Sequence, residues 1–130
     1  MEITVLIADD SEIVLKAMCR ILNETPDMLV VGQASSFDEL LELLARTEPD
    51  VLVLDLGMPE RDGFTVEHVK SALEGVCILT VSVSTEPESE ALSLGYGAHM
   101  LLDKMDLFAT LASSIVECKK RANAQAAGTS

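Results

Sequence analysis

The chain has 130 residues, of which 48% are apolar and 24% charged, and its formal net charge is −13. This length suits one domain, and the composition excludes a disordered or fibrous chain. The acidic surface would repel phosphate backbones and anionic lipids, so we expect neither direct nucleic-acid binding nor membrane association. Three widely spaced cysteines and the absence of a signal sequence or transmembrane run predict a soluble protein in the reducing cytoplasm.

Short apolar runs alternate with helical periodicity along the first part of the chain. The apolar run Ile3–Ala8 predicts a strand buried on both faces. Apolar residues at helical spacing follow, and Pro26 ends that predicted helix. Residues 28–31 predict a second strand, after which Ser36 and Glu39 form a capping box for a second helix.

The same alternation continues through the middle of the chain. Residues 51–54 predict a third strand that ends at Asp55, and a loop leads from there to a helix stopped by Gly75. Residues 76–83 predict a fourth strand. Thr85 and Glu88 form a second capping box, which opens a short polar helix.

The last unit consists of a strand at residues 98–102 and a helix that Asp106 can cap. Residues 123–130 are small and polar, so we expect a flexible tail or the start of a linker there, after a domain at residues 1–122.

Five strand–helix units predict an α/β fold: a doubly wound parallel sheet with helices on both faces and the flavodoxin-like strand order 2-1-3-4-5. The alternative is half of a longer Rossmann fold, which would place a glycine-rich turn after the first strand. Residues 9–11, Asp-Asp-Ser, occupy that turn instead, and this disfavours a dinucleotide.

Polar residues mark the ends of several predicted strands. They are Asp9, Asp10, Asp55, Ser82 and Lys104. Each alone has a structural interpretation, such as a turn former or a helix cap. Because the carboxyl ends of parallel strands share one edge, we expect them to converge there as a site for a divalent cation and a phosphoryl group.

The two histidines do not extend this pattern. His68 and His99 have no metal-ligand partner at a typical spacing, so we expect both to be surface residues.

Four segments then resemble one family. LIADDS (residues 6–11), VLDLGMP (53–59), DG (62–63) and GA (97–98) followed by Lys104 are similar to the response-regulator receiver domain of two-component signalling. The similarity covers residues 3–122 and is greatest to receivers attached to helix-turn-helix regulators.

The resemblance implies a role for each acidic residue. Asp55 would be the nucleophile that accepts a phosphoryl group. Asp10, Asp9, Asp55 and the backbone carbonyl of Gly57 would bind Mg²⁺, which prefers oxygen ligands and keeps several waters.

The resemblance also implies a switch. Lys104 would pair with the phosphoryl group, and Ser82 would turn toward it, although Thr80 and Ser84 alternate with Ser82 on the same strand. Leu101 stands where the family usually carries an aromatic residue that reports activation, which is a departure from the pattern.

The implied function is a phosphoacceptor signalling switch, with at most self-catalysed phosphorylation and dephosphorylation. The phosphoryl group would come from a histidine kinase, a phosphotransfer protein or a small phosphodonor. A homodimer could form through the fourth helix, fifth strand and fifth helix.

Two alternatives stay open: a scaffold that takes up no phosphate, and a Mg²⁺-dependent phosphatase of the haloacid-dehalogenase kind. The phosphatase would need a second aspartate where Gly57 stands.

Overall fold

The computed structural model describes residues 2–58, 70–84 and 86–128. The elements in chain order are β1 (Ile3–Ala8), α1 (Glu12–Asn23), β2 (Met28–Ala34), α2 (Phe37–Thr47), β3 (Val51–Asp55), β4 (Cys77–Ser82), α4 (Pro87–Gly95), β5 (Met100–Asp103), the 3₁₀ turn η1 (Lys104–Asp106) and α5 (Leu107–Gly128). None of the helices in this described part combines the length and the apolar character that crossing a membrane requires.

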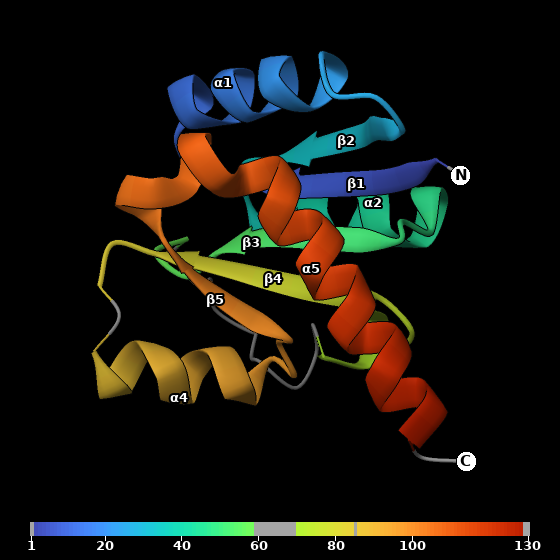
Figure 1. The fold of residues 1–130 in the computed structure, drawn as a ribbon. Coiled ribbons are helices and arrows are strands. Elements are labelled where there is room, and N and C mark those ends of the chain that lie inside the picture. Colours follow the sequence, from blue (N-terminus) through green and yellow to red (C-terminus); the bar gives the residue numbers. More distant parts are fainter. Residues whose placement is uncertain (1, 59–69, 85, 129–130) are drawn as a thin grey trace.

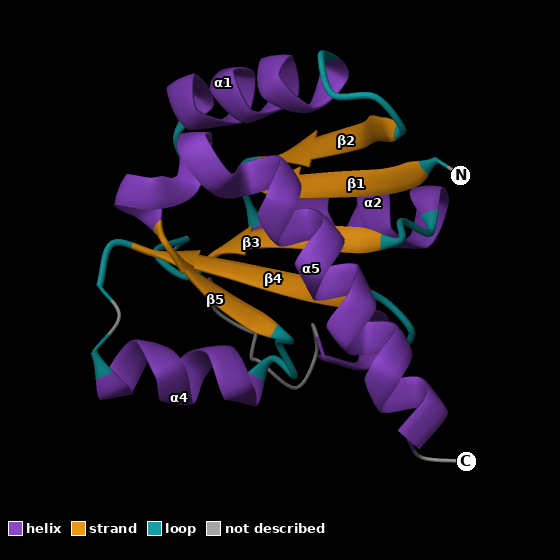
Figure 2. Ribbon diagram, viewed as in Figure 1, coloured by secondary structure: helices purple, strands orange, loops and turns teal. Residues whose placement is uncertain are grey.

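The five strands form one parallel sheet in the order β2-β1-β3-β4-β5, which confirms the predicted fold class. In its register Ala8 lies opposite Leu54, and Ser82 lies opposite Asp103. Figure 2 shows that the arrowheads of all five strands point toward the same edge. The loops that follow the strands therefore meet along one edge of the sheet.

Helices cover both faces of the sheet because successive strand side chains point to opposite sides. Figure 1 shows α5 crossing in front of the sheet and α2 lying behind it. The core on the α1 and α5 side includes Val5, Ile7, Val53, Leu79, Leu15, Met18, Leu111, Ile115, Cys77 and Cys118. The core on the α2 side includes Leu6, Leu52, Leu54, Ile78, Phe37, Leu40, Leu44 and Tyr96, with Leu92 of α4 against it.

The predicted helix caps have mixed outcomes. The Ser36 hydroxyl accepts a hydrogen bond from the Glu39 N–H at 3.3 Å, so Ser36 caps α2 as predicted. The reciprocal half of the box differs from the prediction, because the Glu39 carboxylate accepts from the Ser35 N–H at 3.2 Å.

The N-cap of α4 is Glu86, which makes no side-chain cap hydrogen bond. Pro87 occupies the first turn there, and its fixed φ favours that position without help from a cap. The predicted Thr85–Glu88 box involves a residue, Thr85, outside the described part of the chain and stays a prediction.

The prediction that Asp106 caps the last helix is wrong. Asp106 does not cap it, because Asp103 already caps the preceding 3₁₀ turn: its carboxylate accepts a hydrogen bond from the Met105 N–H at 2.9 Å. Residues 123–128 continue α5, which runs to Gly128, and the expected tail or linker start at residues 123–130 stays a prediction. This segment is rich in alanine, the residue with the highest helix propensity.

Some of the predicted features lie outside the described residues. They are the segment at residues 62–63, His68 and most of the helix before Gly75. Residues 70–72 are helical, and Leu73 is buried against the α2 side of the core.

Candidate functional site

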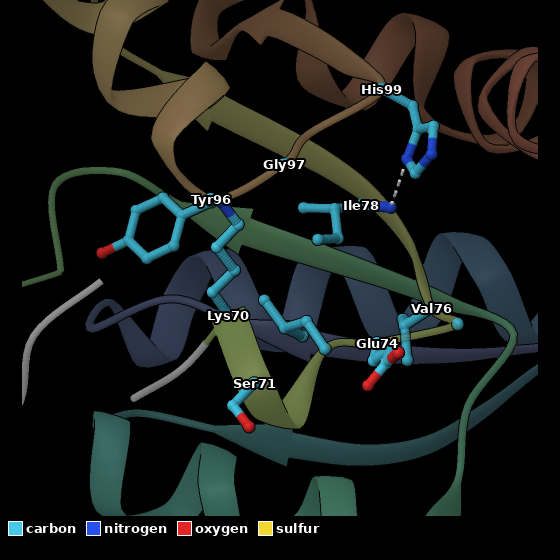
Figure 3. Close-up of a pocket in the computed structure, with 10 residues that line it drawn as sticks. Lys70, Ser71, Glu74, Val76, Ile78, Tyr96, Gly97 and His99 are labelled. Atoms are coloured by element: carbon cyan, nitrogen blue, oxygen red, sulfur yellow. Dashed lines mark hydrogen bonds between the residues drawn. The ribbon is translucent and has the colours of Figure 1, made fainter. Parts of the chain in front are cut away.

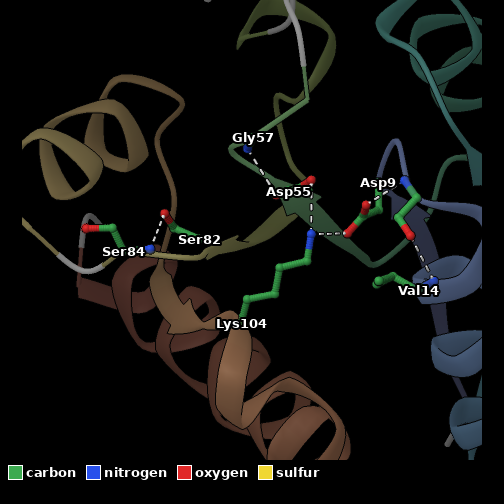
Figure 4. A network of polar contacts seen from close by, with 8 residues as sticks. Asp9, Val14, Asp55, Gly57, Ser82, Ser84 and Lys104 are labelled. Carbon is green, nitrogen blue, oxygen red and sulfur yellow. Dashed lines mark hydrogen bonds and ion pairs between the residues drawn. The ribbon is translucent and has the colours of Figure 1, made fainter.

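Three of the predicted site residues meet in a charged contact at the carboxyl edge of the sheet. Asp9 directly follows β1, Asp55 is the last residue of β3, and Lys104 directly follows β5. The Lys104 Nζ lies 3.0 Å from Asp9 Oδ2 and 3.4 Å from Asp55 Oδ2. Figure 4 marks both contacts with dashed lines. One ammonium group thus bridges two carboxylates that come from different strands.

Backbone N–H groups fix the other oxygen of each carboxylate. Ser11 donates to Asp9 Oδ1 at 2.8 Å, and Gly57 donates to Asp55 Oδ1 at 3.0 Å. Both bonds span two residues, so each aspartate is held by the turn that follows its own strand. A side chain at position 57 would crowd this turn, because a Cβ added to Gly57 would lie 3.3 Å from Asp55 Oδ1.

Burial differs sharply among the three aspartates. Asp9 is 1% exposed and Asp55 is 4% exposed, whereas Asp10 is open to solvent. Carboxylate oxygens of all three residues lie within 4.8 Å of one another. Three hard oxygen donors at this separation fit a small divalent cation such as Mg²⁺, which tolerates an incomplete protein shell because it keeps waters. The donor set therefore agrees with the predicted metal site.

Burial and the neighbouring charges shift the pKa values of Asp55 and Lys104. Burial raises the pKa of Asp55 above its ordinary value of 3.8, and the charge of Asp9 adds to this, against the opposing effects of the Gly57 N–H and Lys104. Burial alone would lower the pKa of Lys104, but its hydrogen bond to Asp9 and the two carboxylate charges make the net shift upward. At neutral pH Lys104 is therefore a permanent positive charge beside a desolvated carboxylate.

A cavity of about 370 Å³ opens beside this contact. Its lining is formed by Asp10, Asp55, Leu56, Gly57, Ser82, Val83, Glu88, Ser89, Leu92 and Lys104. The cavity thus brings together residues from the ends of β3, β4 and β5 and the first turns of α4. Sequence reasoning missed Ser89 and named Glu88 only as a helix-cap residue, since nothing in their spacing assigns either of them to a cavity.

The three hydroxyls of the β4 segment have different surroundings. Ser82 is buried; it donates to the Ser89 hydroxyl at 3.2 Å and accepts from the Ser84 N–H at 3.2 Å. Thr80 is buried between α4 and β5, where it contacts Ser93 at 2.6 Å and donates to the Met100 carbonyl at 2.9 Å. Of the three, only Ser82 lines the cavity beside Asp55.

The prediction for Leu101 concerns the neighbouring strand. Leu101 lies opposite Thr80 in the sheet and is half-buried. The aliphatic side chain of Leu101 has no aromatic ring and no polar atom, so it lacks the group whose change of rotamer would report activation.

The chain also matches a known family along most of its length. A family model described as the response regulator receiver domain matches residues 5–115. The chain belongs to the response-regulator receiver family. A receiver domain is a phosphoacceptor signalling domain of two-component systems, and this membership confirms the resemblance found in the sequence.

Relatives of this receiver domain include two curated proteins named protein-glutamate methylesterase/protein-glutamine glutaminase. The one from Thiobacillus denitrificans is 40% identical over 111 residues, which covers 82% of this chain and 31% of the relative. The one from Nitrosomonas europaea is 37% identical over 110 residues, with the same coverage of 82% and 31%. The chain therefore spans about a third of the length of these curated relatives.

Solved receiver domains share the fold. The response regulator domain of Thermotoga maritima CheB matches with a TM-score of 0.76 and 27% identity, covering 94% of this chain and 96% of that one. The receiver domain of the response regulator NarL from Mycobacterium tuberculosis matches with a TM-score of 0.79 and 26% identity, covering 92% and 97%. The structural neighbours thus include a CheB receiver and a NarL receiver, and the fold alone does not select between these two kinds.

Proposed function

We propose that this receiver domain takes a phosphoryl group onto Asp55 from a histidine kinase or a phosphotransfer protein, with Mg²⁺ as cofactor, in the cytoplasm. The observation that carries the proposal is the position of the Asp55 carboxylate. It is 4% exposed, lies at the wall of a cavity and is paired with Lys104. A desolvated carboxylate beside an open cavity is suited to nucleophilic attack. The cation beside it opposes the upward effect of burial on the pKa of Asp55.

The proposed reaction is a transfer between oxygen or nitrogen donors and the Asp55 carboxylate. An oxygen of Asp55 attacks the phosphorus, and the bond between phosphorus and the donor's leaving atom breaks. The Lys104 ammonium, now 3.4 Å from Asp55, then pairs with a phosphoryl oxygen. This new pairing would draw Lys104 away from Asp9 and disturb the bridge that joins β1, β3 and β5.

Asp9, Asp10 and Asp55 would hold the Mg²⁺, together with the backbone carbonyl of Gly57. The ion, when bound, offsets negative charge on the carboxylates and on the incoming phosphoryl group. Lys104 already balances part of the charge of Asp9 and Asp55, and the exposed Asp10 is the carboxylate that an arriving cation can meet first.

Ser82 is the proposed switch hydroxyl. Its present bonds run to Ser89 of α4 and to the Ser84 N–H, so a turn toward a phosphoryl group on Asp55 would break its contact with α4. Thr80 is less suited, because its hydroxyl already links Ser93 of α4 to the Met100 carbonyl. With Leu101 in place of an aromatic residue, the change would pass through α4 and not through a ring rotation.

We place the output contact on the face formed by α4, β5 and α5, where a partner or a second copy of the chain could bind. Large apolar side chains are exposed there: Leu94 is 72% exposed, Met105 is 92% exposed and Phe108 is 48% exposed. Loss of the Ser82–Ser89 bond would act directly on one side of this face.

The test is phosphoryl uptake from acetyl phosphate with Mg²⁺, followed by intact mass. We expect one phosphoryl group per chain in the parent, and none with chelator or in the Asp55→Asn variant, because the amide is a poor nucleophile. Asp50→Asn is the matched control, since Asp50 lies at the other end of β3, and it should keep full uptake.

Three outcomes would contradict the proposal. Full uptake by Asp55→Asn would move the acceptor elsewhere. Continuous release of phosphate without accumulated phosphoprotein would favour the phosphatase. No uptake by the parent from any donor would favour the scaffold.

A further inference from the structure

Two cysteines that lie 41 positions apart in the sequence meet at the end of the sheet opposite the acidic site. Cys77 begins β4 and Cys118 lies in α5. Their Sγ atoms are 2.7 Å apart, and the two side chains are 2% and 0% exposed. The remaining cysteine, Cys19, is half-buried and accepts a hydrogen bond from Asn23 within its own helix.

A cavity of about 730 Å³ reaches this pair from one side. Cys77 lines it, whereas Cys118 does not. The other wall comes from the later part of α5, including Lys119. The two residues thus have different surroundings: Cys77 borders a solvent-connected space, whereas Cys118 is fully buried and does not line it.

A metal site is the first alternative, because a ring nitrogen of His99 and both sulfurs lie within 4.8 Å of one another. The prediction that His99 is a surface residue without such neighbours is therefore wrong; it is half-buried, since parallel pairing of β4 and β5 brings its ring beside β4. Its Nδ1 accepts a hydrogen bond from the Ile78 N–H at 3.2 Å, as Figure 3 shows beside a neighbouring cavity.

Two features disfavour a metal there. With Nδ1 as acceptor, the neutral ring carries its proton on the other nitrogen, so neither His99 nitrogen offers a free lone pair. Zinc–sulfur bonds of about 2.3 Å in a tetrahedron would also hold the two sulfurs roughly 3.8 Å apart, whereas Cys77 and Cys118 are at 2.7 Å. The geometry suits a bond between the sulfurs better than an ion between them.

We propose that Cys77 and Cys118 form an oxidation-sensitive dithiol, which a hydroperoxide converts into a disulfide that links β4 to α5. The Cys77 thiolate sulfur attacks the terminal peroxide oxygen, the O–O bond breaks, and Cys77 becomes a sulfenic acid while the released alkoxide or hydroxide takes a proton. The Cys118 sulfur then attacks the Cys77 sulfur, the S–O bond breaks, and water leaves. The peroxide gains two electrons, and the two thiols lose them.

The electrostatics agree with this division of roles. The hydrogen bond between the two thiols, together with the charge of Lys119, lowers the pKa of Cys77 against the opposing effect of burial. The hydrogen bond with Cys77, followed by burial, raises the pKa of Cys118. Cys77, which borders the cavity, is therefore the thiol that meets the peroxide first, and Cys118 is the resolving one.

The test oxidises the chelator-treated parent with one equivalent of hydrogen peroxide. We expect free thiols to fall from three to one, a Cys77–Cys118 linked peptide, and reversal by dithiothreitol. The closed loop is long, so the melting temperature should rise by roughly 10 °C. Asp55→Asn should give the same cross-link, so failure here and failure of phosphoryl uptake are distinguishable.

Variants separate the steps. Cys118→Val should stop at the Cys77 sulfenic acid, which a cyclic diketone traps, whereas Cys19→Ser should cross-link like the parent. The proposal is overturned by oxidation of Cys19 before the pair, by oxidation of Cys77 without a cross-link, or by no reaction. It is also overturned if one Zn²⁺ binds per chain, protects both thiols and is lost in His99→Ala, because that result would identify a metal site.

Discussion

Asp50 and Asp55 lie at the two ends of β3, and each pairs with a lysine, yet their surroundings differ in almost every respect. Asp50 is partly exposed; its Oδ2 accepts hydrogen bonds from the Thr4 N–H at 2.9 Å and from the Thr4 hydroxyl at 3.0 Å. These bonds, the backbone one first, lower the pKa of Asp50 below 3.8. Asp55 is buried, and burial raises its pKa. One carboxylate joins two strands, and the other is kept in a costly charged state at a cavity.

This contrast teaches how one strand can serve both stability and chemistry. A carboxylate whose oxygens are satisfied by donors stabilises the fold, whereas a desolvated carboxylate beside a like charge opposes folding. Only the second gains stability from a bound cation. Substitutions at the two ends of β3 should therefore act in opposite directions on stability.

The largest difference in the free energy of unfolding is expected between substitutions of the two lysines. Lys104→Ala leaves Asp9 and Asp55 buried without a counter-charge, so we expect a loss of about 3 kcal/mol in the free energy of unfolding at neutral pH in chelator. Lys119→Ala removes only an exposed contact of 3.8 Å to Asp50 and should cost about 0.5 kcal/mol. Urea denaturation measures both; equal losses would mean that Lys104 is not the essential counter-charge.

Substitutions of the two aspartates should change the free energy of unfolding in opposite directions. Asp50→Ala leaves the Thr4 N–H without its acceptor and should cost about 1–2 kcal/mol. Asp55→Asn removes one of two buried like charges while an amide oxygen can still accept from Gly57, so we expect a gain of about 1 kcal/mol in chelator. Thermal melts of both variants check this, and a loss in Asp55→Asn would contradict the view that its charge opposes folding.

Mg²⁺ should stabilise the fold through the acidic cluster at the Asp55 end of β3, and not through Asp50 at the other end. Mg²⁺ in excess binds the native site and not the unfolded chain, so it should stabilise the parent. At a free Mg²⁺ concentration one hundred times the dissociation constant the gain in the free energy of unfolding is about 2.7 kcal/mol, which raises the melting temperature by several degrees. Asp10→Asn should show a smaller rise, because a ligand is missing. Asp50→Asn should show the parent's full rise. Calorimetric scans with chelator and with Mg²⁺ measure these shifts, and equal shifts in all three proteins would exclude the acidic cluster as the binding site.

The smallest effect is the pH dependence of stability. Because the folded pKa of Asp55 is raised, its contribution is fully present below the unfolded value near 3.8 and is lost as pH rises through the folded pKa. The advantage of Asp55→Asn over the parent should therefore grow from acid toward neutral pH. Asp50 has the opposite sign: its contribution is present above 3.8 and is lost as pH falls through its lowered folded pKa. Melts across this range should show the two trends, and a constant advantage would contradict the raised pKa of Asp55.

The fold and the main part of the site could be predicted from the sequence because strand ends are marked locally. Asp9, Asp55 and Lys104 each follow an apolar run, and parallel strands necessarily bring such residues to one edge. The cap of the last helix could not be predicted, because Asp103 and Asp106 both suit a cap and only the 3₁₀ turn distinguishes them.

Contacts that depend on helix placement were also beyond the sequence. The Ser82–Ser89 bond requires the angle at which α4 leaves β4, which no spacing encodes. The meeting of Cys77, His99 and Cys118 depends on the register of β4 with β5 and on where α5 crosses the sheet. Each of these residues alone resembles an ordinary core or surface residue, and only the tertiary packing joins them.

Direct mapping of the phosphorylated residue tests the central claim, that Asp55 and not another acid of the cluster accepts the phosphoryl group. The parent would be phosphorylated with acetyl phosphate and Mg²⁺, reduced with borohydride, which converts an aspartyl phosphate into homoserine, and sequenced as peptides by mass spectrometry. The account predicts homoserine at position 55 alone. Homoserine at position 9, 10 or 50, or a stable phosphate on Ser82, would contradict it.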